Sequence, residues 1–368
     1  MAKIYLQEKL TGHQGQVLTF NTNNEPVLNT ITPKNDRKIN IKTQDTGVTI
    51  DVSDSSSHIF IPAWSGLYNC SVNVPNDGTY TVRAVKGTNA KNETIKVIGN
   101  GNYYVEFESF TSPILNDNSW DLIKSAAQQN TGSTYWSVGD CKQVTLNGNA
   151  GAHSFSNVAV NVFIIDFNHN GLVEGFGISF QFGKKLATDT SDICFCDSSY
   201  GTTAAATNKF CINTSNTNIG GWRDSSMRKN IIGTSLTSTN TFISCLPSDL
   251  KSALKLVNKY TNVSTNTTAS FELVSDYVFL LSGSEYTGVG NTLNGNESQY
   301  NIIYSYYSNH TVAKYDINAA TFTSNVVHWT RTRRANSTGY FIAMVVNNTQ
   351  ASTSTRYSYG IAPAFVVG

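Results

Sequence analysis

Residues 328–367 read HWTRTRRANSTGYFIAMVVNNTQASTSTRYSYGIAPAFVV and alternate between two kinds of sequence. Residues 340–346 form a short apolar run, which predicts a buried strand. On both sides of this run the chain carries Arg, Asn, Ser, Thr and Tyr, with almost no acidic residue and no regular period. Short polar and aromatic side chains on a fixed framework make an adaptable contact surface. The stretch therefore predicts either a surface that contacts a ligand or an ordinary hairpin with polar loops.

The composition of the chain narrows the classes of partner. Its 368 residues are enough for two or three domains, and only 14% of them are charged, with a formal net charge of +1. No basic run is dense enough to predict a nucleic-acid partner. No apolar run approaches the length of a membrane span, and the N-terminus lacks the apolar region of a signal peptide. We therefore expect a chain that is made in the cytoplasm, is not exported by a signal peptide and does not insert into a membrane.

The six cysteines do not predict a metal site. None of them has the CxxC spacing of a zinc ribbon or a redox pair. Cys194 and Cys196 would share one face of a strand, so a metal site is conceivable there, but reduced, buried thiols are the interpretation that we favour. We assign no metal-binding residue and expect no cofactor.

Residues 1–34 are predicted to be a separate attachment segment. They contain one short apolar run, residues 17–20, followed by Asn-rich turn residues and a proline, so they cannot bury a core alone. The sequence of this segment resembles short segments found near the start of many tailed-phage fibre and tail-associated proteins. The match rests on Gly15, Gln16, Val17, Phe20, Pro26 and Val27. This resemblance implies docking to a larger particle, that is, to phage tail proteins.

Residues 35–111 are predicted to form a small all-β sandwich. Apolar residues alternate with polar ones in several short segments, for example at Ile50 and Val52 and at Tyr80 and Val82. Gly and Asn turns separate these segments. Residues 77–82, DGTYTV, resemble the strands of immunoglobulin-like or transthyretin-like spacer modules, which implies a stalk. Trp64 and Cys70 are expected in its core.

Residues 112–368 have the mixed pattern of an α+β domain. Ser119 precedes Trp120, Ile123 and Ala127 at helical spacing, and residues 247–257 and 300–307 predict two further helices. Residues 160–167 form an apolar run that suits a strand buried on both faces. A turn at residues 146–148 is expected to close the strand before it.

This third region also resembles a family of phage and gut-bacterial proteins, over residues 116–367. The matching motifs, in order, are Asn118-Ser119-Trp120, residues 135–140 (YWSVGD), residues 163–170 (FIIDFNHN), Glu174, Gly220-Gly221-Trp222, Met227-Arg228, Leu246-Pro247, residues 277–282 (YVFLLS) and residues 360–365 (GIAPAF). That family is similar to the C-type-lectin-fold variable proteins of diversity-generating retroelements, in which mutagenic reverse transcription alters adenine-containing codons near the C-terminus. The resemblance implies a C-type-lectin-like domain.

Under this resemblance, residues 328–367 divide into scaffold and ligand-facing positions. The scaffold would comprise Trp329, Phe341, Val345, Val346, Ile361, Pro363 and Phe365. The residues implied to face a ligand are Arg331, Arg333, Arg334, Asn336, Tyr340, Asn347, Asn348, Thr353, Arg356 and Tyr357. Whether this surface is diversified or fixed stays open, because one sequence cannot show variability.

Two chemical interpretations, a catalytic site and a calcium site, compete with the binding interpretation. No nucleophile elbow, zinc-protease helix, P-loop or dinucleotide motif is present, and the last cysteine is Cys245, so we expect no enzyme. His169 lies in a turn and is interpreted as a structural hydrogen-bonding residue. Residues 166–171, DFNHNG, match the first half of a calcium loop, but Gly177 stands where the bidentate glutamate belongs and Glu174 replaces it only in part. An Asn-Gly turn that closes a strand is the simpler interpretation.

Together these observations predict a non-enzymatic tail-associated protein of a phage particle, assembled in the host cytoplasm, that recognises a receptor on a bacterial cell. The receptor could be a protein or a glycan, and a homo-oligomer is expected, with the trimer as the usual arrangement of tail fibres. Two alternatives stay open. One is a structural tail or decoration protein without a ligand, and the other is a glycan-degrading tail enzyme with paired carboxylates in a cleft.

Overall fold

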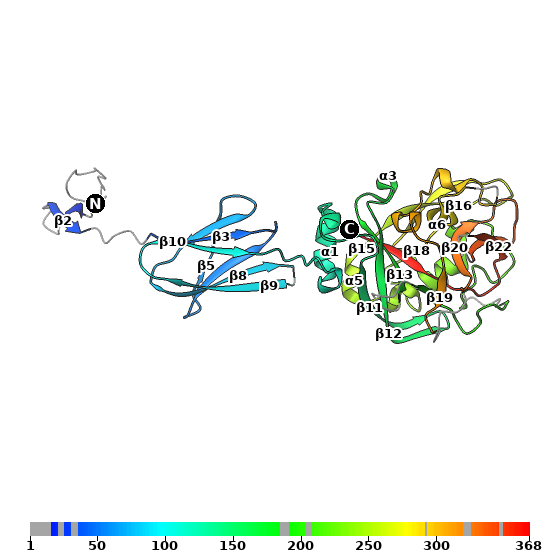
Figure 1. The fold of residues 1–368 in the computed structure, drawn as a ribbon, viewed down its shortest axis with the longest axis horizontal. Helices are drawn as coiled ribbons and strands as arrows, with labels where there is room; N and C mark the ends of the chain where they lie inside the picture. Colours follow the sequence, from blue (N-terminus) through cyan, green and yellow to red (C-terminus); the bar gives the residue numbers. More distant parts are fainter. Residues whose placement is uncertain are drawn as a thin grey trace. The chain divides into compact units, whose positions relative to one another are not determined.

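The computed structural model describes residues 16–20, 26–30, 36–87, 89–184, 191–203, 208–290, 293–318, 325–345 and 349–368, with side chains from residue 36 onward. The chain divides into two compact units, Met1–Phe110 and Thr111–Gly368 (Figure 1). Strands outnumber helices, and the chain as a whole is α+β, as predicted. Among the described residues, no helix is long and apolar enough to cross a membrane.

The predicted attachment segment lies mostly outside the described residues. Its described part is the backbone of two strands, β1 (Gln16–Phe20) and β2 (Pro26–Thr30). They pair in antiparallel fashion, with Gln16 opposite Thr30 and Phe20 opposite Pro26. Docking to a particle is not addressed by this hairpin and stays a prediction.

The remainder of the first unit consists of two four-stranded sheets, which we call the β-sandwich (residues 36–110) (Figure 1). The strand orders are β10-β3-β7-β6 and β5-β4-β8-β9. Their bounds are β3 (Arg37–Thr43), β4 (Thr49–Asp54), β5 (Ile59–Phe60), β6 (Ala63–Trp64), β7 (Asn69–Asn73), β8 (Gly78–Lys86), β9 (Asn89–Val97) and β10 (Gly101–Phe107). The first and last of these strands, β3 and β10, run parallel to each other, and the other pairs are antiparallel.

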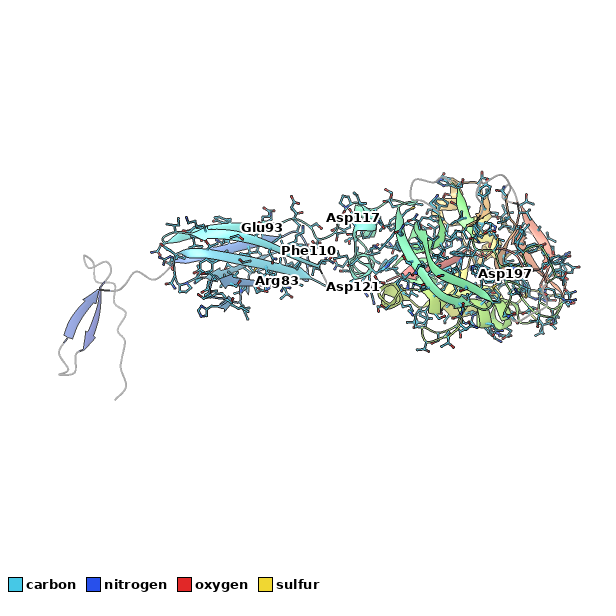
Figure 2. All side chains as sticks on the ribbon, turned by 90° about the horizontal axis from the view of Figure 1, so that it is seen from below. Arg83, Glu93, Phe110, Asp117, Asp121 and Asp197 are labelled. Carbon is cyan, nitrogen blue, oxygen red and sulfur yellow. The ribbon has the colours of Figure 1, made fainter. Side chains whose placement is uncertain are left out.

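Alternating side chains explain the β-sandwich. Ile39 and Ile41 of β3 are buried, as are Val52 of β4 and Val82 of β8, because residues two apart on a strand share a face. Charged residues such as Arg83 and Glu93 are exposed (Figure 2). The predicted strands are thus confirmed, and Cys70 is buried as expected. The expectation for Trp64 was wrong: this side chain is 42% exposed, since the two-residue strand β6 lies at the edge of its sheet.

The second unit, which we call the head (residues 111–368), is organised around an eight-stranded sheet. Five strands follow the order β11-β12-β13-β14-β19, and the C-terminal strand β23 pairs with β13, β15 and β18. Their bounds are β11 (Cys141–Ala150), β12 (His153–Phe167), β13 (Ile178–Lys184), β14 (Asp192–Cys194), β15 (Leu254–Lys255), β18 (Val278–Leu280), β19 (Lys314–Asp316) and β23 (Pro363–Val367). The last strand of the chain therefore lies inside the sheet.

Strands β12, β13 and β23 are buried on both faces where they cross the centre of the head. All residues of β13 and of β23 are buried, and so are residues 160–165 of β12, as the apolar run predicted. The expected turn at residues 146–148 is wrong, because β11 continues to Ala150. The irregularity at this point is a β-bulge between Leu146 and Gly148, which adds a residue without ending the strand.

The helices of the head are short. The predicted first helix is confirmed as α1 (Trp120–Gln128), where the Ser119 side chain accepts a hydrogen bond from the Leu122 N–H. The second is confirmed only as α5 (Ser248–Ala253), because the chain becomes strand from Leu254. The third shrinks to α7 (Ser305–Ser308), and Tyr300 lies outside it. The other helical segments are η1 (Leu115–Asp117), α2 (Gly132–Tyr135), α3 (Gly171–Glu174), α4 (Gly221–Asp224), the π-helix η2 (Met227–Ile232), η3 (Phe242–Cys245), α6 (Gly283–Thr287) and η4 (Glu297–Gln299).

Two smaller sheets complete the head. One is the hairpin of β16 (Val257–Asn262) and β17 (Phe271–Asp276). The other has the order β20-β21-β22, with β20 (His328–Arg333), β21 (Tyr340–Met344) and β22 (Gln350–Ser354). The six cysteines are free and all but Cys141 are buried, as predicted. The sheet β20-β21-β22 carries four of the residues that the sequence implied to face a ligand, namely Arg331, Arg333, Tyr340 and Thr353.

Candidate recognition surface

All six residues of β20 are buried, which sequence alternation did not predict. Trp329 pairs with Ala343 and Arg333 pairs with Phe341, so the register between β20 and β21 shifts between these two pairs. Extra residues on one strand interrupt the alternation of inward and outward side chains. Two arginines that the sequence implied to face a ligand, Arg331 and Arg333, are consequently 0% exposed.

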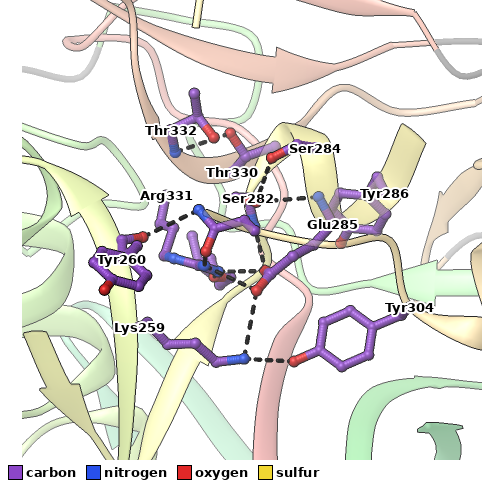
Figure 3. A network of polar contacts seen from close by, with 12 residues as sticks. Lys259, Tyr260, Ser282, Ser284, Glu285, Tyr286, Tyr304, Thr330, Arg331 and Thr332 are labelled. Carbon is purple, nitrogen blue, oxygen red and sulfur yellow. Dashed lines mark hydrogen bonds and ion pairs between the residues drawn. The ribbon is translucent and has the colours of Figure 1, made fainter. Parts of the chain in front are cut away.

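Arg331 is the centre of a buried ionic network (Figure 3). Its guanidinium donates to both carboxylate oxygens of Glu285, and the distance from Nη2 to Oε1 is 2.9 Å. It also donates to the Leu280 carbonyl at 3.0 Å and to Asn301 Oδ1 at 3.1 Å. A planar, forked donor that satisfies carboxylate and carbonyl oxygens together fixes one geometry for the strand that carries it.

The partner carboxylate belongs to a helix start that the sequence encodes locally. Ser282 is the N-cap of α6, its side chain accepts from the Glu285 N–H at 3.1 Å, and Glu285 Oε2 accepts from the Ser282 N–H at 2.8 Å. This reciprocal pair is a capping box. The same glutamate therefore begins α6 and holds β20.

A second buried cation balances the network. The Lys259 Nζ lies 2.7 Å from Glu174 Oε1, 3.4 Å from Glu285 Oε1 and 2.6 Å from the Tyr304 hydroxyl, over the ring of Phe279. Two cations thus face two carboxylates. Burial acts to raise the pKa of Glu285, but the charges of Arg331 and Lys259 outweigh it and hold that pKa well below its ordinary value. Glu285 is therefore ionised at neutral pH.

Glu297 is a third buried carboxyl group beside this network, and its pKa is shifted in the opposite direction to that of Glu285. Its Oε2 accepts hydrogen bonds from the hydroxyls of Thr332 and Ser284, while its Oε1 is buried without a partner among the described residues. Burial raises the pKa of Glu297 to about 7, and the more distant charge of Arg331 only partly opposes this. Its proton is thus retained through most of the acidic range.

The structure also tests the calcium interpretation. Asp166 already accepts from His169 Nδ1 at 2.8 Å and from Ser305 Oγ at 2.7 Å. Within the described residues, the one group of side chains spaced to hold a metal is His169, Glu174 and Glu285, whose ligand atoms lie within 4.8 Å of one another. The Lys259 ammonium contacts both glutamates of this group, and Tyr304 stacks on the His169 ring with 3.6 Å between centroids. These residues do not fit a cation site, because an ammonium already neutralises them.

A second buried polar cluster fixes the main sheet, and the sequence analysis missed it. Asp192 of β14 lies 3.2 Å from the Lys184 Nζ and 3.6 Å from the Lys314 Nζ, and it accepts from the Tyr306 hydroxyl at 3.0 Å. Lys314 is 1% exposed, and burial lowers its pKa. The available signal was a lysine at the end of an otherwise apolar strand, residues 178–184 (ISFQFGK).

The predicted ligand-facing residues therefore separate into three groups. Arg331 and Arg333 are buried and cannot face a ligand, and this corrects the prediction. Asn347 and Asn348 lie outside the described residues. The others are half-buried or exposed, and we call them the display surface: Arg334, Asn336, Tyr340, Thr353, Arg356 and Tyr357.

Contacts join part of the display surface. The Arg334 guanidinium lies over the Tyr340 ring at 5.5 Å and donates to Ser352 Oγ at 2.8 Å. Tyr357 stacks on Tyr359 with the ring planes 7° apart. Thr353 lies opposite Phe341, on the other face of the sheet from Tyr340, so it is not part of the same patch.

Asn218, which the sequence analysis did not single out, holds the loop that carries this patch. Its side-chain Nδ2 is within hydrogen-bonding distance of the carbonyls of Arg334, Ser337 and Tyr340, at 3.2, 2.8 and 2.8 Å. Arg333 in turn holds Asn218 in place, since its Nε donates to the Asn218 carbonyl at 2.9 Å. The exposed side chains thus project from a backbone that buried groups fix.

Residues 203–368, somewhat less than half of the chain, match a family model described as "Domain of unknown function (DUF6273)". Neither the curated proteins nor the solved structures give a significant match. The matched range covers the hairpin β16–β17, the buried ionic network except for Glu174 and His169, and the whole display surface.

Proposed function

We propose that this chain is a non-enzymatic recognition protein whose display surface contacts a target on a bacterial cell. The observation that carries the proposal is the contrast across β20 and the loop that follows it. On the buried side, Arg331, Arg333 and Asn218 fix the backbone through buried contacts. On the outer side, Asn336 and Tyr340 are exposed to solvent, and Arg334, Arg356 and Tyr357 are half-buried. Adaptable side chains on a pre-organised backbone lose little entropy when they bind.

The setting of this surface is part of the same proposal and depends on the sequence resemblance. The head would be a C-type-lectin-like domain, the β-sandwich an immunoglobulin-like or transthyretin-like stalk, and residues 1–34 the attachment to a phage tail. The chain would act in the virion as a homo-oligomer, for example a trimer, where many weak contacts combine into firm attachment. Retroelement diversification of the surface belongs to this proposal too. The exposure of Asn336 and Tyr340 supports it, because changes at exposed positions leave the buried core intact.

The hydrolase alternative gains no support from the described surface. A glycan-degrading site needs two carboxylates facing each other across an open cleft. Two hollows on the described residues each contain a single carboxylate, Glu106 in one and Glu272 in the other, and each of these forms an ion pair with a basic residue. We therefore retain binding, rather than catalysis, as the proposed function.

The test is binding of the full chain, fluorescently labelled, to a panel of intact bacteria. The double variant Tyr340→Ala/Arg356→Ala should lose at least about tenfold in affinity for any strain that the wild type binds, because tyrosine and arginine dominate such contacts. Thr237→Ala, in an exposed loop of the head, is the matched control and should bind like the wild type. Equal binding by the double variant would overturn the proposal.

Diversification has a separate test at the level of DNA. The codons for residues 328–367 would be sequenced across a population of the same genetic element, together with a search for a neighbouring reverse transcriptase and template copy. Changes confined to adenine-containing codons, with Trp329, Pro363 and Phe365 constant, are expected. A uniform sequence without a template would contradict diversification and leave a fixed recognition surface.

A further inference from the structure

A hollow of about 390 Å³ lies on the head beside the loop that joins β16 and β17. This volume is within the range of small-molecule sites, which is roughly 300–1,000 Å³. Its walls come from the loop and from α4. The residues that line it are Arg223, Val263, Ser264, Thr265, Asn266, Thr268, Ala269, Ser270 and Glu272.

The lining is rich in groups that both donate and accept hydrogen bonds. Serine and threonine hydroxyls and one amide make up most of it, and there is no aromatic ring and no large aliphatic side chain other than Val263. Such walls offer little to an apolar ligand. They match a ligand whose own surface consists of hydroxyl groups.

The charges at the rim cancel. Arg223 pairs with Glu272 at 2.9 Å and with Asp224 at 2.9 Å, and Lys229 lies 3.4 Å from Asp224. Two cations therefore face two carboxylates, so the rim attracts neither an anion nor a cation strongly. The paired guanidinium and carboxylate can still donate to and accept from neighbouring hydroxyls of one ligand.

The loop that forms the hollow is fixed before any ligand arrives. Asn262 Oδ1 accepts from the backbone N–H groups of Ser264 and Ser270, each at 3.1 Å, and so ties the two ends of the loop together. Asn266 Oδ1 accepts from the Thr268 N–H at 2.8 Å. A loop held in this way gives up little conformational entropy on binding.

The buried Arg333 connects this hollow with the display surface. Its Nη2 donates to the Asn266 carbonyl at 2.6 Å in the hollow's loop and lies 3.4 Å from the Ser337 carbonyl in the loop that leads to Tyr340. One guanidinium thus positions both loops side by side. This accounts for an arginine that the sequence implied to face a ligand and that the structure buries.

We propose that this hollow is a binding site for a neutral oligosaccharide, a fixed subsite next to the display surface. The hydroxyl-rich lining, the cancelled rim charges and the pre-organised loop carry the proposal. It rests on the proposed recognition function in that it names the ligand class, and the residues that line the hollow all lie outside the stretch 328–367. Arg333, which lies within that stretch, acts in it as a positioning residue.

The experiment measures binding of the full chain to neutral oligosaccharides of defined composition, namely glucose, galactose, mannose and N-acetylglucosamine oligomers, by saturation-transfer NMR and titration. Uronic-acid oligomers serve as anionic probes. Thr268→Trp places an indole in the hollow from an exposed position, and Thr237→Trp is the matched control in another exposed loop. We expect wild type and control to bind at least one neutral probe, and Thr268→Trp to bind it at least tenfold more weakly.

The outcomes separate this inference from the proposed function. Absence of binding to every neutral probe, binding of anionic probes alone, or equal affinity of Thr268→Trp and wild type would each overturn the inference. Cell binding that depends on Tyr340 and Arg356, together with no binding of any neutral probe, would overturn the inference and leave the proposed function standing. Binding of a neutral probe that Thr268→Trp removes would support the hollow even if no cell were bound.

Discussion

The β-sandwich and the head differ in how far they bury their charged residues. Most ion pairs among the described residues of the β-sandwich are partly or fully exposed, as in Lys42–Glu106, whose side chains are 57% and 52% exposed, and Lys86–Asp45 is the exception, at 11% and 3%. In the head, Lys259, Glu285 and Arg331 are each at most 1% exposed, and both cations contact Glu285. Both units bury apolar cores, so the difference lies in what the charges do rather than in whether a core exists.

The comparison shows which interactions determine the strand positions in each unit. Alternating apolar residues are enough to place the strands of the β-sandwich, because a shift by one residue would expose its core. β20 has no such alternation, and its position depends on buried ionic partners that only one arrangement satisfies. Removing one partner of a buried pair leaves an uncompensated charge, whereas removing an exposed pair does not.

The largest effect is expected for Arg331→Met. This change leaves Glu285 buried with Lys259 as its remaining cationic partner, and should lower the free energy of unfolding of the head by about 3–5 kcal/mol. Tryptophan fluorescence during urea unfolding measures this selectively, because Trp120, Trp136, Trp222 and Trp329 lie in the head and only Trp64 lies in the β-sandwich. A loss below about 1 kcal/mol would mean that this buried pair stabilises the head no more than a surface pair does, and would contradict the difference between the two units.

The double variant Arg331→Met/Glu285→Gln is the matched control for that change. It removes the carboxylate charge that loses its guanidinium partner in the single variant, so it should be less destabilised than the sum of the two single variants. The double-mutant cycle gives the coupling free energy directly. Additive single effects would mean that the two side chains do not act as a pair.

The next effect concerns pH and Glu297. Because burial raises its pKa to about 7 in the folded head, the folded state binds more protons than the unfolded state between about pH 4.5 and pH 7. Its contribution to stability is therefore full below about pH 4.5 and declines as the pH rises to about 7, by roughly 3 kcal/mol in all. Glu297→Gln cannot ionise and should remove this decline. Urea unfolding of the head at pH 5, 6, 7 and 8 measures it, and the same slope in both proteins would contradict the assignment.

The smallest effect is expected for Lys42→Ala in the β-sandwich. Its ion pair with Glu106 is about half exposed, so the change should cost far less stability than Arg331→Met, and less still at high salt. Circular dichroism during thermal unfolding, with and without 1 M salt, measures this effect. A cost as large as that of Arg331→Met would show that exposure does not separate the two kinds of pair.

Local sequence signals existed for several parts of the candidate site. The capping box of α6 was not predicted, but it could have been found in Ser282 and Glu285, since its two hydrogen bonds depend on a spacing of three residues. The polar and aromatic character of residues 334–359 was also visible. What could not be predicted was the separation of the arginines, because Arg331, Arg333 and Arg334 look alike in sequence and differ only in the partners that the fold brings to them.

The sequence by itself determined that this chain is α+β, with strands in residues 36–110 and a buried strand at residues 160–165, because hydrophobic period and run length are properties of neighbouring residues. It also determined the start of α1 at Ser119, through a local hydrogen bond. Only the tertiary structure decided that β20 is buried on both faces and that Arg333 holds Asn266 while Arg334 meets Tyr340. The physical reason is that these contacts join residues far apart along the chain, and the burial of a charge is decided by its partners rather than by its neighbours in sequence.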